Sequence, residues 1–401
     1  MAETRAQTGH LAIAIVFAAH GAVTGSFATR VPWIQDHANL SAGQLGLALA
    51  FPALGSLLSM PMAGAVSHRF GARRALISLL PLWTLALMLP GHAPTLLTLC
   101  GALLIFGATA GISDVVMNAI GVETEARLGR SIMSGLHGAW SAGALIGSAG
   151  GTLAAHMDAD ARVHHAMASI VLTCVGILAA RKTLDVTPAP EAEAPPHFAL
   201  PPKSALIIGA VALCAVFAEG ASLDWSAVYL RDILDASPGL AAATTTAFAL
   251  TMAIARFAGD AVVDRIGGVR AVRYSGVLAT LGGLLVVLAA NPALTIAGFG
   301  LIGLGIAVVV PLAFAAAARS GSNAAQAIAG VATITYAAGL IAPSAIGGIA
   351  NATSLTVSFG LVTALAVVLV LGASVMRTNK SSTPKAAGEP ATPTASSASD
   401  G

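Results

Sequence analysis

Two carboxylates, Asp114 and Glu219, lie inside long apolar runs of this 401-residue chain. If those runs cross a membrane, a charged side chain within them is costly and marks a functional position by default. Asn118 follows Asp114 by four residues, which places both side chains on one face of a helix. An apolar environment favours the protonated form of a carboxyl group, so Asp114 could bind and release a proton. The structural alternative is a hydrogen bond that holds its helix to a neighbour.

A second acid, Asp224, follows Glu219 by five residues and is itself followed by Trp225. Five residues turn a helix by about 140°, so the two acids cannot both point straight into one pathway. Tryptophan favours the interface between lipid and water. We therefore predict that Glu219 belongs to the pathway of a solute or a proton. Asp224 and Trp225 are predicted to form an outer gate or an interfacial anchor.

Two histidine-containing pairs are further pathway candidates. His20 and Thr24 are one helical turn apart in the first apolar run, and His137 and Trp140 open the fifth. A histidine can bind a solute or exchange a proton, and a tryptophan can stack on a sugar ring. For each pair the alternative is packing against neighbouring helices.

A charge network is predicted at the cytoplasmic ends of two helices. Arg256 and Asp260 are four residues apart and share a helical face. Two short loops carry similar residues, namely His68, Arg69, Gly71 and Arg73 in the first, and Asp264 and Arg265 in the second. We expect these groups to form a latch that holds one conformation and breaks in another. The alternative is a set of static ion pairs.

The composition shows which elements position these residues. Apolar residues make up 56% of the chain and charged residues only 9%, against about 25% in a typical soluble domain. The mean hydropathy is +0.83. These values exclude a cytosolic enzyme, a nucleic-acid-binding protein and a disordered scaffold. They predict an all-α membrane protein.

Twelve apolar runs are long enough to cross a bilayer as helices, and the first is expected to be a span rather than a cleaved signal peptide. If the N-terminus is cytoplasmic, 16 of the 20 Lys and Arg residues fall in cytoplasmic segments. This distribution predicts that both termini are cytoplasmic.

The longest break between apolar runs, residues 183–202, contains six prolines. Proline cannot continue a helix, and this composition cannot bury itself, so the break predicts a linker between two halves. The predicted organisation is a cytoplasmic N-terminal tail at 1–8, a six-helix bundle at 9–181, a cytoplasmic linker at 182–203, a second six-helix bundle at 204–376 and a disordered cytoplasmic tail at 377–401.

The two halves resemble each other when the chain is shifted by 196 residues. Residues 64–74 then share five of eleven positions with residues 260–270, and residues 140–154 share six of fifteen with residues 336–350. Within this second segment, Gly143, Gly147 and Gly151 form a small-residue stripe, which predicts a close-packing face where bundles slide. An internal repeat of this kind suits two bundles that rock about one central site.

On the loop Gly64-x-x-x-His68-Arg69-Phe70-Gly71 and its copy Asp260-x-x-x-Asp264-Arg265-x-Gly267, the chain resembles the major facilitator superfamily. The family pattern is a glycine followed by Asp-Arg-x-Gly, so His68 and Asp260 depart from it. The resemblance covers nearly the whole chain. It implies twelve transmembrane helices in two pseudo-symmetric six-helix bundles, with helices 1, 4, 7 and 10 lining the path.

Within that superfamily, Asp114 to Asn118 and Glu219 to Tyr229 are similar to the bacterial fucose-permease-like branch. In that branch an acid followed four residues later by Asn is tied to proton and sugar handling. Its sugar-proton symporters carry an Asp where this chain has Ala28. Either His20 replaces that acid, or the carrier is not a symporter.

The resulting prediction is a secondary active transporter of a small polar organic solute, sugar-like or a related metabolite, in the bacterial inner membrane. Protons are the expected coupling ion, and the expected state is a monomer that needs no cofactor, metal or nucleic acid. Alternatives are a drug or metabolite efflux carrier, an uncoupled facilitator, a solute sensor and a membrane enzyme. The enzyme is disfavoured because the acids are spread over several helices without a nucleophile-base pair.

Overall fold

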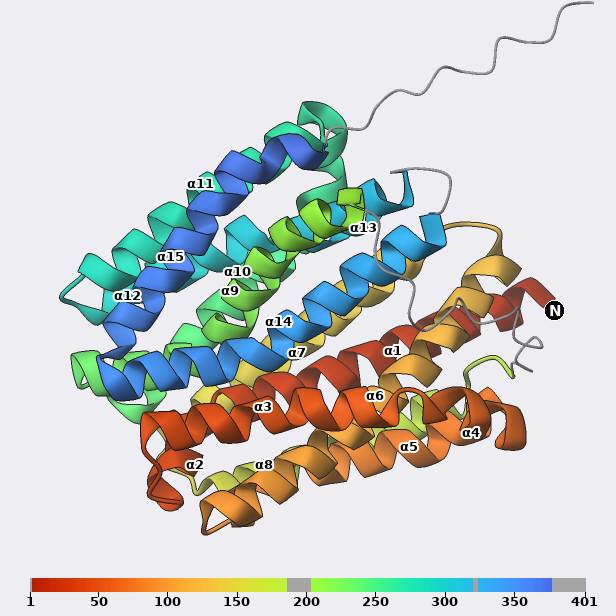
Figure 1. The fold of residues 1–401 in the computed structure, drawn as a ribbon. Coiled ribbons are helices and arrows are strands. Elements are labelled where there is room, and N and C mark those ends of the chain that lie inside the picture. The colour runs from red at the N-terminus through yellow and green to blue at the C-terminus, as the bar shows by residue number, and fades with distance from the viewer. Residues whose placement is uncertain (1, 186–202, 320–323, 377–401) are drawn as a thin grey trace, which may run out of the picture.

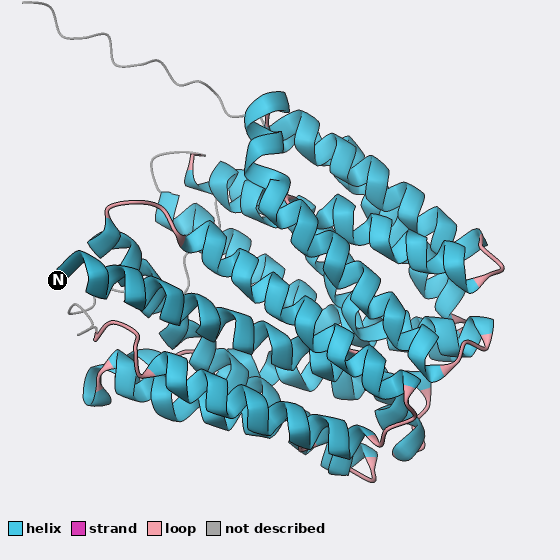
Figure 2. Cartoon of the chain, turned by 180° about the vertical axis from the view of Figure 1, so that it is seen from behind, coloured by secondary structure: helices cyan, strands magenta, loops and turns pink. Residues whose placement is uncertain are grey.

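Helices account for almost all of the described chain. The computed structural model describes residues 2–185, 203–319 and 324–376, and within these ranges it contains no strand (Figure 2). Most of the predicted linker and the whole predicted C-terminal tail lie outside the described residues. The first helix begins at Ala2, so most of the predicted N-terminal tail extends the first span.

The helices form two bundles of six principal helices (Figure 1). The N-terminal bundle contains α1 (Ala2–Ala28), α2 (Val31–His37), α3 (Ala42–Ser59), α4 (Met62–Phe70), α5 (Ala72–Ala86), η1 (Pro90–His92), α6 (Leu96–Leu128), α7 (Met133–His156) and α8 (Ala161–Ala180). The C-terminal bundle contains α9 (Lys203–Leu234), α10 (Pro238–Ile266), α11 (Gly268–Leu288), α12 (Pro292–Ile306), α13 (Val309–Ala318), α14 (Ala324–Ala352), α15 (Leu355–Gly372) and η2 (Ala373–Met376). The start of α1 and the end of α15 lie at one end of the molecule, here called the termini end, and the opposite end is called the distal end (Figure 1).

Eleven segments in the described part of the chain are long and apolar enough to cross a membrane. The twelfth predicted span is α7, whose 24 residues include many glycines. It runs beside α1 from Ala18 to Thr29, so the two helices share the same depth. The predicted all-α fold of two six-helix bundles is confirmed.

The helix boundaries confirm the internal repeat. The N-cap residues Ser41 and Ser237 are 196 residues apart, as are Thr95 and Asn291. Gly71 and Gly267 have the same separation and nearly the same backbone, with φ 82° and 81°. Such a positive φ favours glycine, which explains why both copies of the loop keep it.

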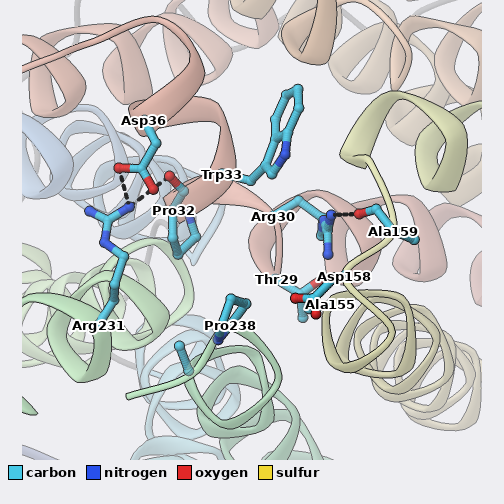
Figure 3. A pocket seen from close by; sticks show the side chains of 11 residues that line it. Thr29, Arg30, Pro32, Trp33, Asp36, Ala155, Asp158, Ala159, Arg231 and Pro238 are labelled. Carbon is cyan, nitrogen blue, oxygen red and sulfur yellow. Dashed lines mark hydrogen bonds and ion pairs between the residues drawn. The ribbon is translucent and has the colours of Figure 1, made fainter. Parts of the chain in front are cut away.

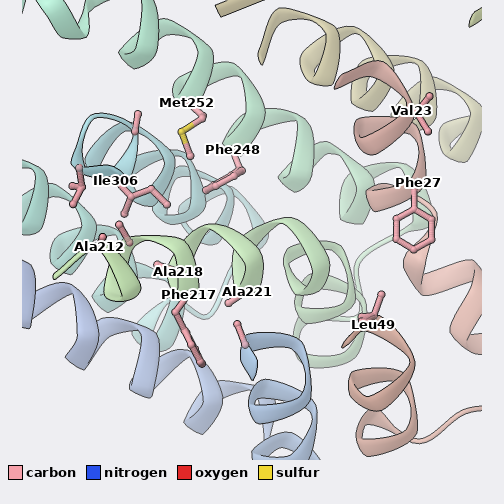
Figure 4. Packing of buried hydrophobic residues seen from close by; sticks show 14 of the residues in the cluster. Val23, Phe27, Leu49, Ala212, Phe217, Ala218, Ala221, Phe248, Met252 and Ile306 are labelled. Atoms are coloured by element: carbon pink, nitrogen blue, oxygen red, sulfur yellow. The ribbon is translucent and has the colours of Figure 1, made fainter. Parts of the chain in front are cut away.

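Both bundles contribute residues to one cluster of buried apolar side chains. Figure 4 shows Val23, Phe27 and Leu49 packed in the N-terminal bundle, and Phe217 and Phe248 among the residues packed in the C-terminal one. The apolar packing of one bundle is therefore continuous with that of the other.

The glycine stripe of α7 packs inside one bundle, which corrects its prediction as a sliding face between bundles. A methyl group on Gly143 or Gly147 would overlap the carbonyl oxygen of Ala18 or Ala22 on α1. In return, Gly21 and Gly25 of α1 face the backbone of α7. Because small residues let two backbones approach closely, α1 and α7 are held together.

The contacts between the bundles involve other residues. On one side, Gly46 of α3 meets Pro343 and Gly347 of α14. On the other side, α7 meets α10, where the Thr152 and Thr246 hydroxyls are 2.8 Å apart.

We predict that Gly147→Ala lowers the free energy of unfolding by about 1–3 kcal/mol, because the added methyl group overpacks the α1–α7 contact. Gly150→Ala on the same helix is the control, since a methyl group there meets nothing within 4 Å. Thermal unfolding in detergent measures both. Equal midpoints for the two variants would contradict the close-packing assignment.

Candidate functional site

Arg256 of α10 connects the two bundles near the middle of the molecule. It donates one hydrogen bond to Glu219 Oε1 of α9 at 2.9 Å and one to Ser141 Oγ of α7 at 3.0 Å. Both members of the ion pair are half-buried, with Arg256 21% and Glu219 22% exposed. The pair lines a small cavity of about 20 Å³ together with Trp140 and Met252. A buried guanidinium needs such acceptors, because an unpaired charge away from water is costly.

The structure therefore places Arg256 differently from the predicted latch. Its partner is Glu219, and Asp260 instead accepts a hydrogen bond from Ser134 Oγ of α7 at 3.1 Å. The side chains of Arg256 and Asp260 thus each cross from α10 to α7. Sequence spacing alone favoured the pair within α10 because those residues share a face.

His20 lies buried in the N-terminal bundle, where it is 6% exposed. Trp140 Nε1 donates to His20 Nδ1 at 3.3 Å, which leaves the ring proton on Nε2, 3.4 Å from the Ala110 carbonyl oxygen. The imidazole also stacks on Trp83, with ring centroids 5.0 Å apart. Both ring nitrogens are engaged, so His20 must break one of these bonds before it can bind a solute or a second proton.

Asp114 of α6 is half-buried. It lies close enough to His20, His137 and Tyr336 to act on them electrostatically. Tyr336 belongs to α14 and is the repeat counterpart of Trp140. Asn118 does not bind the carboxylate of Asp114, because its amide donates to the Asp114 backbone oxygen at 2.9 Å.

These contacts bring together the residues that we call the central cluster. Its members are Asp114, His20, His137, Trp140, Ser141, Glu219, Arg256 and Tyr336. They come from α1, α6 and α7 of one bundle and α9, α10 and α14 of the other. Ser141 and Tyr336 were not predicted, although the alignment of the two halves brought Tyr336 opposite Trp140.

Three further predicted pathway residues lie outside the central cluster. Thr24 and Asp224 are half-buried. Trp225 is fully buried, with 0% exposure. It is therefore a core residue and not the interfacial anchor that its residue type suggested, because an anchor must reach the lipid headgroups.

At the termini end, the first loop contacts the start of the segment between the bundles. Arg73 donates to Asp185 Oδ2 at 3.0 Å, and Arg69 lies over the Phe70 ring. His68, Asp264 and Arg265 are exposed. Within the described residues, no ion pair joins the loop at Gly71 to the loop at Gly267.

At the distal end, Arg231 of α9 closes the opening between the bundles. It donates to the Pro32 carbonyl oxygen at 2.7 Å, to Gln35 Oε1 at 2.6 Å and to Asp36 Oδ1 at 2.9 Å, all on α2. The sequence alone did not single out Arg231. Its one distinctive signal was its place at the end of an apolar run on the side with few basic residues.

A model of the Major Facilitator Superfamily matches residues 13–223 and 205–398. The chain belongs to this superfamily. It is therefore a multi-pass membrane transporter and not an enzyme.

Curated relatives span nearly the same length. An uncharacterized transporter of Sinorhizobium fredii, y4wD, is 34% identical over 368 residues, covering 91% of this chain and 97% of its own. Membrane protein MosC of Rhizobium meliloti is 30% identical over 379 residues, covering 93% of this chain and 91% of its own. Neither name tests the fucose-permease-like assignment, which stays a prediction.

Solved structures of major facilitator transporters share the fold. A mutant of the nucleoside transporter NupG has a TM-score of 0.73 at 12% identity, covering 92% of this chain and 99% of its own. A bacterial homolog of the human lysosomal transporter Spinster, in an inward-facing and occupied conformation, has a TM-score of 0.68 at 14% identity, covering 92% of this chain and 95% of its own.

The ion pair between Arg256 and Glu219 leads to a prediction about the free energy of unfolding. Arg256→Gln leaves the Glu219 carboxylate half-buried without its partner and should lower the free energy of unfolding by about 1–3 kcal/mol. Adding Glu219→Gln removes the stranded charge and should restore part of that loss. Thermal unfolding of the wild type, both single variants and the double variant gives the coupling energy. Strictly additive effects would show that the pair contributes nothing specific.

Proposed function

We propose that this transporter carries a small polar organic solute, sugar-like or a related metabolite, by alternating access. The observation that carries the proposal is the central cluster, which places charged and hydrogen-bonding groups of both bundles around one point in an otherwise apolar interior. A site shared by two bundles changes shape when they rock, as alternating access requires.

Three kinds of contact in the cluster fit such a solute. A solute hydroxyl can take the place of one partner in the hydrogen bonds among Arg256, Glu219 and Ser141. Trp140 lines the small cavity beside the Arg256–Glu219 pair and can pack on a ring. Protons are the proposed coupling ion, because Asp114 and Glu219 carry two negative charges against one positive charge on Arg256. Protonation of one acid would cancel the remaining charge.

An uncoupled facilitator is the second candidate. Ala28 is 2% exposed at the position where related symporters carry an acid, and both ring nitrogens of His20 are engaged. In that case the central cluster binds the solute without a proton step.

The proposed setting is the bacterial inner membrane, with the termini end in the cytoplasm. The basic residues of the short loops support this orientation, since Arg69, Arg73 and Arg130 all lie at the termini end. The Arg231 contact then closes the outer side. We propose a monomer, because each bundle packs against the other bundle of the same chain.

Asp114→Asn should abolish proton-driven accumulation in proteoliposomes and spare counterflow, because the amide cannot exchange a proton. The solute is the one that most raises the thermal midpoint in a screen of sugars, polyols and nucleosides. Asp235→Asn, in an exposed distal loop, is the control and should keep accumulation. Unchanged accumulation by Asp114→Asn would exclude that residue as the coupling site. If the wild type exchanges solute but never accumulates it under a proton gradient, the uncoupled facilitator is correct.

Arg231→Gln should raise the population with an open distal end. Loss of about 1–2 kcal/mol of closing energy changes a population by roughly 5- to 30-fold. The measurement is the rate at which an impermeant maleimide labels Ala241→Cys, which is 1% exposed, in a chain without Cys100, Cys174 and Cys214. Arg162→Gln is the matched control, because its partner Asp160 lies in the same bundle. Labelling that is no faster than in this control would remove Arg231 from the closing contacts.

A further inference from the structure

A cavity of about 130 Å³ lies at the distal end, away from the central cluster (Figure 3). Both bundles contribute to its wall. We call it the distal cavity, and it is lined by Thr29, Arg30, Pro32, Trp33, Asp36, Ala155, Asp158, Ala159, Arg231, Pro238 and Ala241. A water molecule needs roughly 10–15 Å³ of such space, so a molecule of several non-hydrogen atoms fits.

Arg30 is the unusual member of this wall. It is only 3% exposed, and among the described residues its guanidinium makes one hydrogen bond, to the carbonyl oxygen of Ala159. Its Nε has no partner in the described part of the chain, and no described carboxylate lies within ion-pair distance. Asp158 and Asp160 act on it only at longer range. A buried guanidinium with unused N–H groups is costly and favours a ligand that accepts hydrogen bonds.

The neighbouring carboxylates of Asp160 and Asp36 are paired with other arginines and not with Arg30. Hydrogen bonds from Arg162 occupy both oxygens of Asp160 and lower the pKa of that carboxyl to about 2. Across the cavity, Arg231 and Asp36 are already bonded to each other (Figure 3). Arg30 is therefore the lining cation with donors to spare.

We propose that the distal cavity binds a small organic monocarboxylate through Arg30. The planar guanidinium presents parallel N–H groups that match the two oxygens of a carboxylate. Pro32, Trp33 and Ala155 supply an apolar wall for a short carbon skeleton. Asp36 and Asp158 line the same space, so their charges oppose an anion with two or more negative charges. The site is independent of the solute assigned to the central cluster.

Carboxylate binding at this site should stabilise the closed distal end. Arg30 belongs to the N-terminal bundle, whereas Arg231, Pro238 and Ala241 belong to the C-terminal bundle. Opening the distal end separates these walls, so the bound carboxylate favours the conformation in which they meet.

The test is a titration of sodium acetate into the full chain in detergent, followed by tryptophan fluorescence because Trp33 lines the cavity. Sodium chloride keeps the ionic strength constant. The wild type should bind acetate, and Arg30→Gln should raise the dissociation constant at least about tenfold, with Arg30→Lys between them. Arg130→Gln, an exposed arginine at the termini end, should match the wild type.

Two further variants keep the test decisive if Arg30→Gln does not fold. Asp158→Asn removes an opposing charge and should tighten acetate binding several-fold, and asparagine suits the positive φ of 52° at this position. Ala159→Phe fills the cavity and should abolish binding. The proposal is overturned if the wild type binds no acetate, if acetate binds Arg30→Gln or Ala159→Phe as well as the wild type, or if inorganic phosphate binds as tightly as acetate.

Discussion

A cation inside an apolar helix has to be matched by nearby acceptors, and Arg256 shows where this chain provides them. Its two bonds go to Glu219 in its own bundle and to Ser141 in the other. The charge therefore lies at the boundary between the bundles and not within either apolar core. The remaining members of the central cluster are positioned around this boundary by helices of both bundles.

The two bundles repeat one scaffold, but their chemistry differs. Thr95 and Asn291, or Gly71 and Gly267, perform the same local task in each half. The counterpart of Asp114 is Val310, and the counterpart of Arg256 is Met60. The backbone signals thus follow the repeat, whereas Asp114 and Arg256 have no ionisable counterpart in the other half. A symmetric frame with asymmetric charges can bind an asymmetric solute.

The fold could be predicted from the sequence because long apolar runs, prolines and caps are local signals. The participation of Asp114, Glu219, His137 and Trp140 in an interior cluster also followed from the rarity of polar groups in those runs. The partner of Arg256 could not be predicted, because Asp260 and Glu219 are equally plausible acids until the packing of α9 against α10 is known. The prediction that Trp225 is an interfacial anchor was wrong for a related reason. The residue type favours an interface, but the position on the helix decides burial. Arg30 and Arg231 were missed because their partners come from segments distant in the chain.

The reciprocal glycine packing of α1 and α7 has a mechanical consequence. The two helices form one rigid unit, since neither can slide without forcing one backbone into the other. At one end of this unit, α2 follows α1 in the chain and accepts a hydrogen bond from Arg231. At the other end, Ser134 of α7 holds Asp260. Under the proposed alternating access, a tilt of this unit that separates one of these contacts brings the elements at the other end closer together, which couples the two ends without a signal passing through loops.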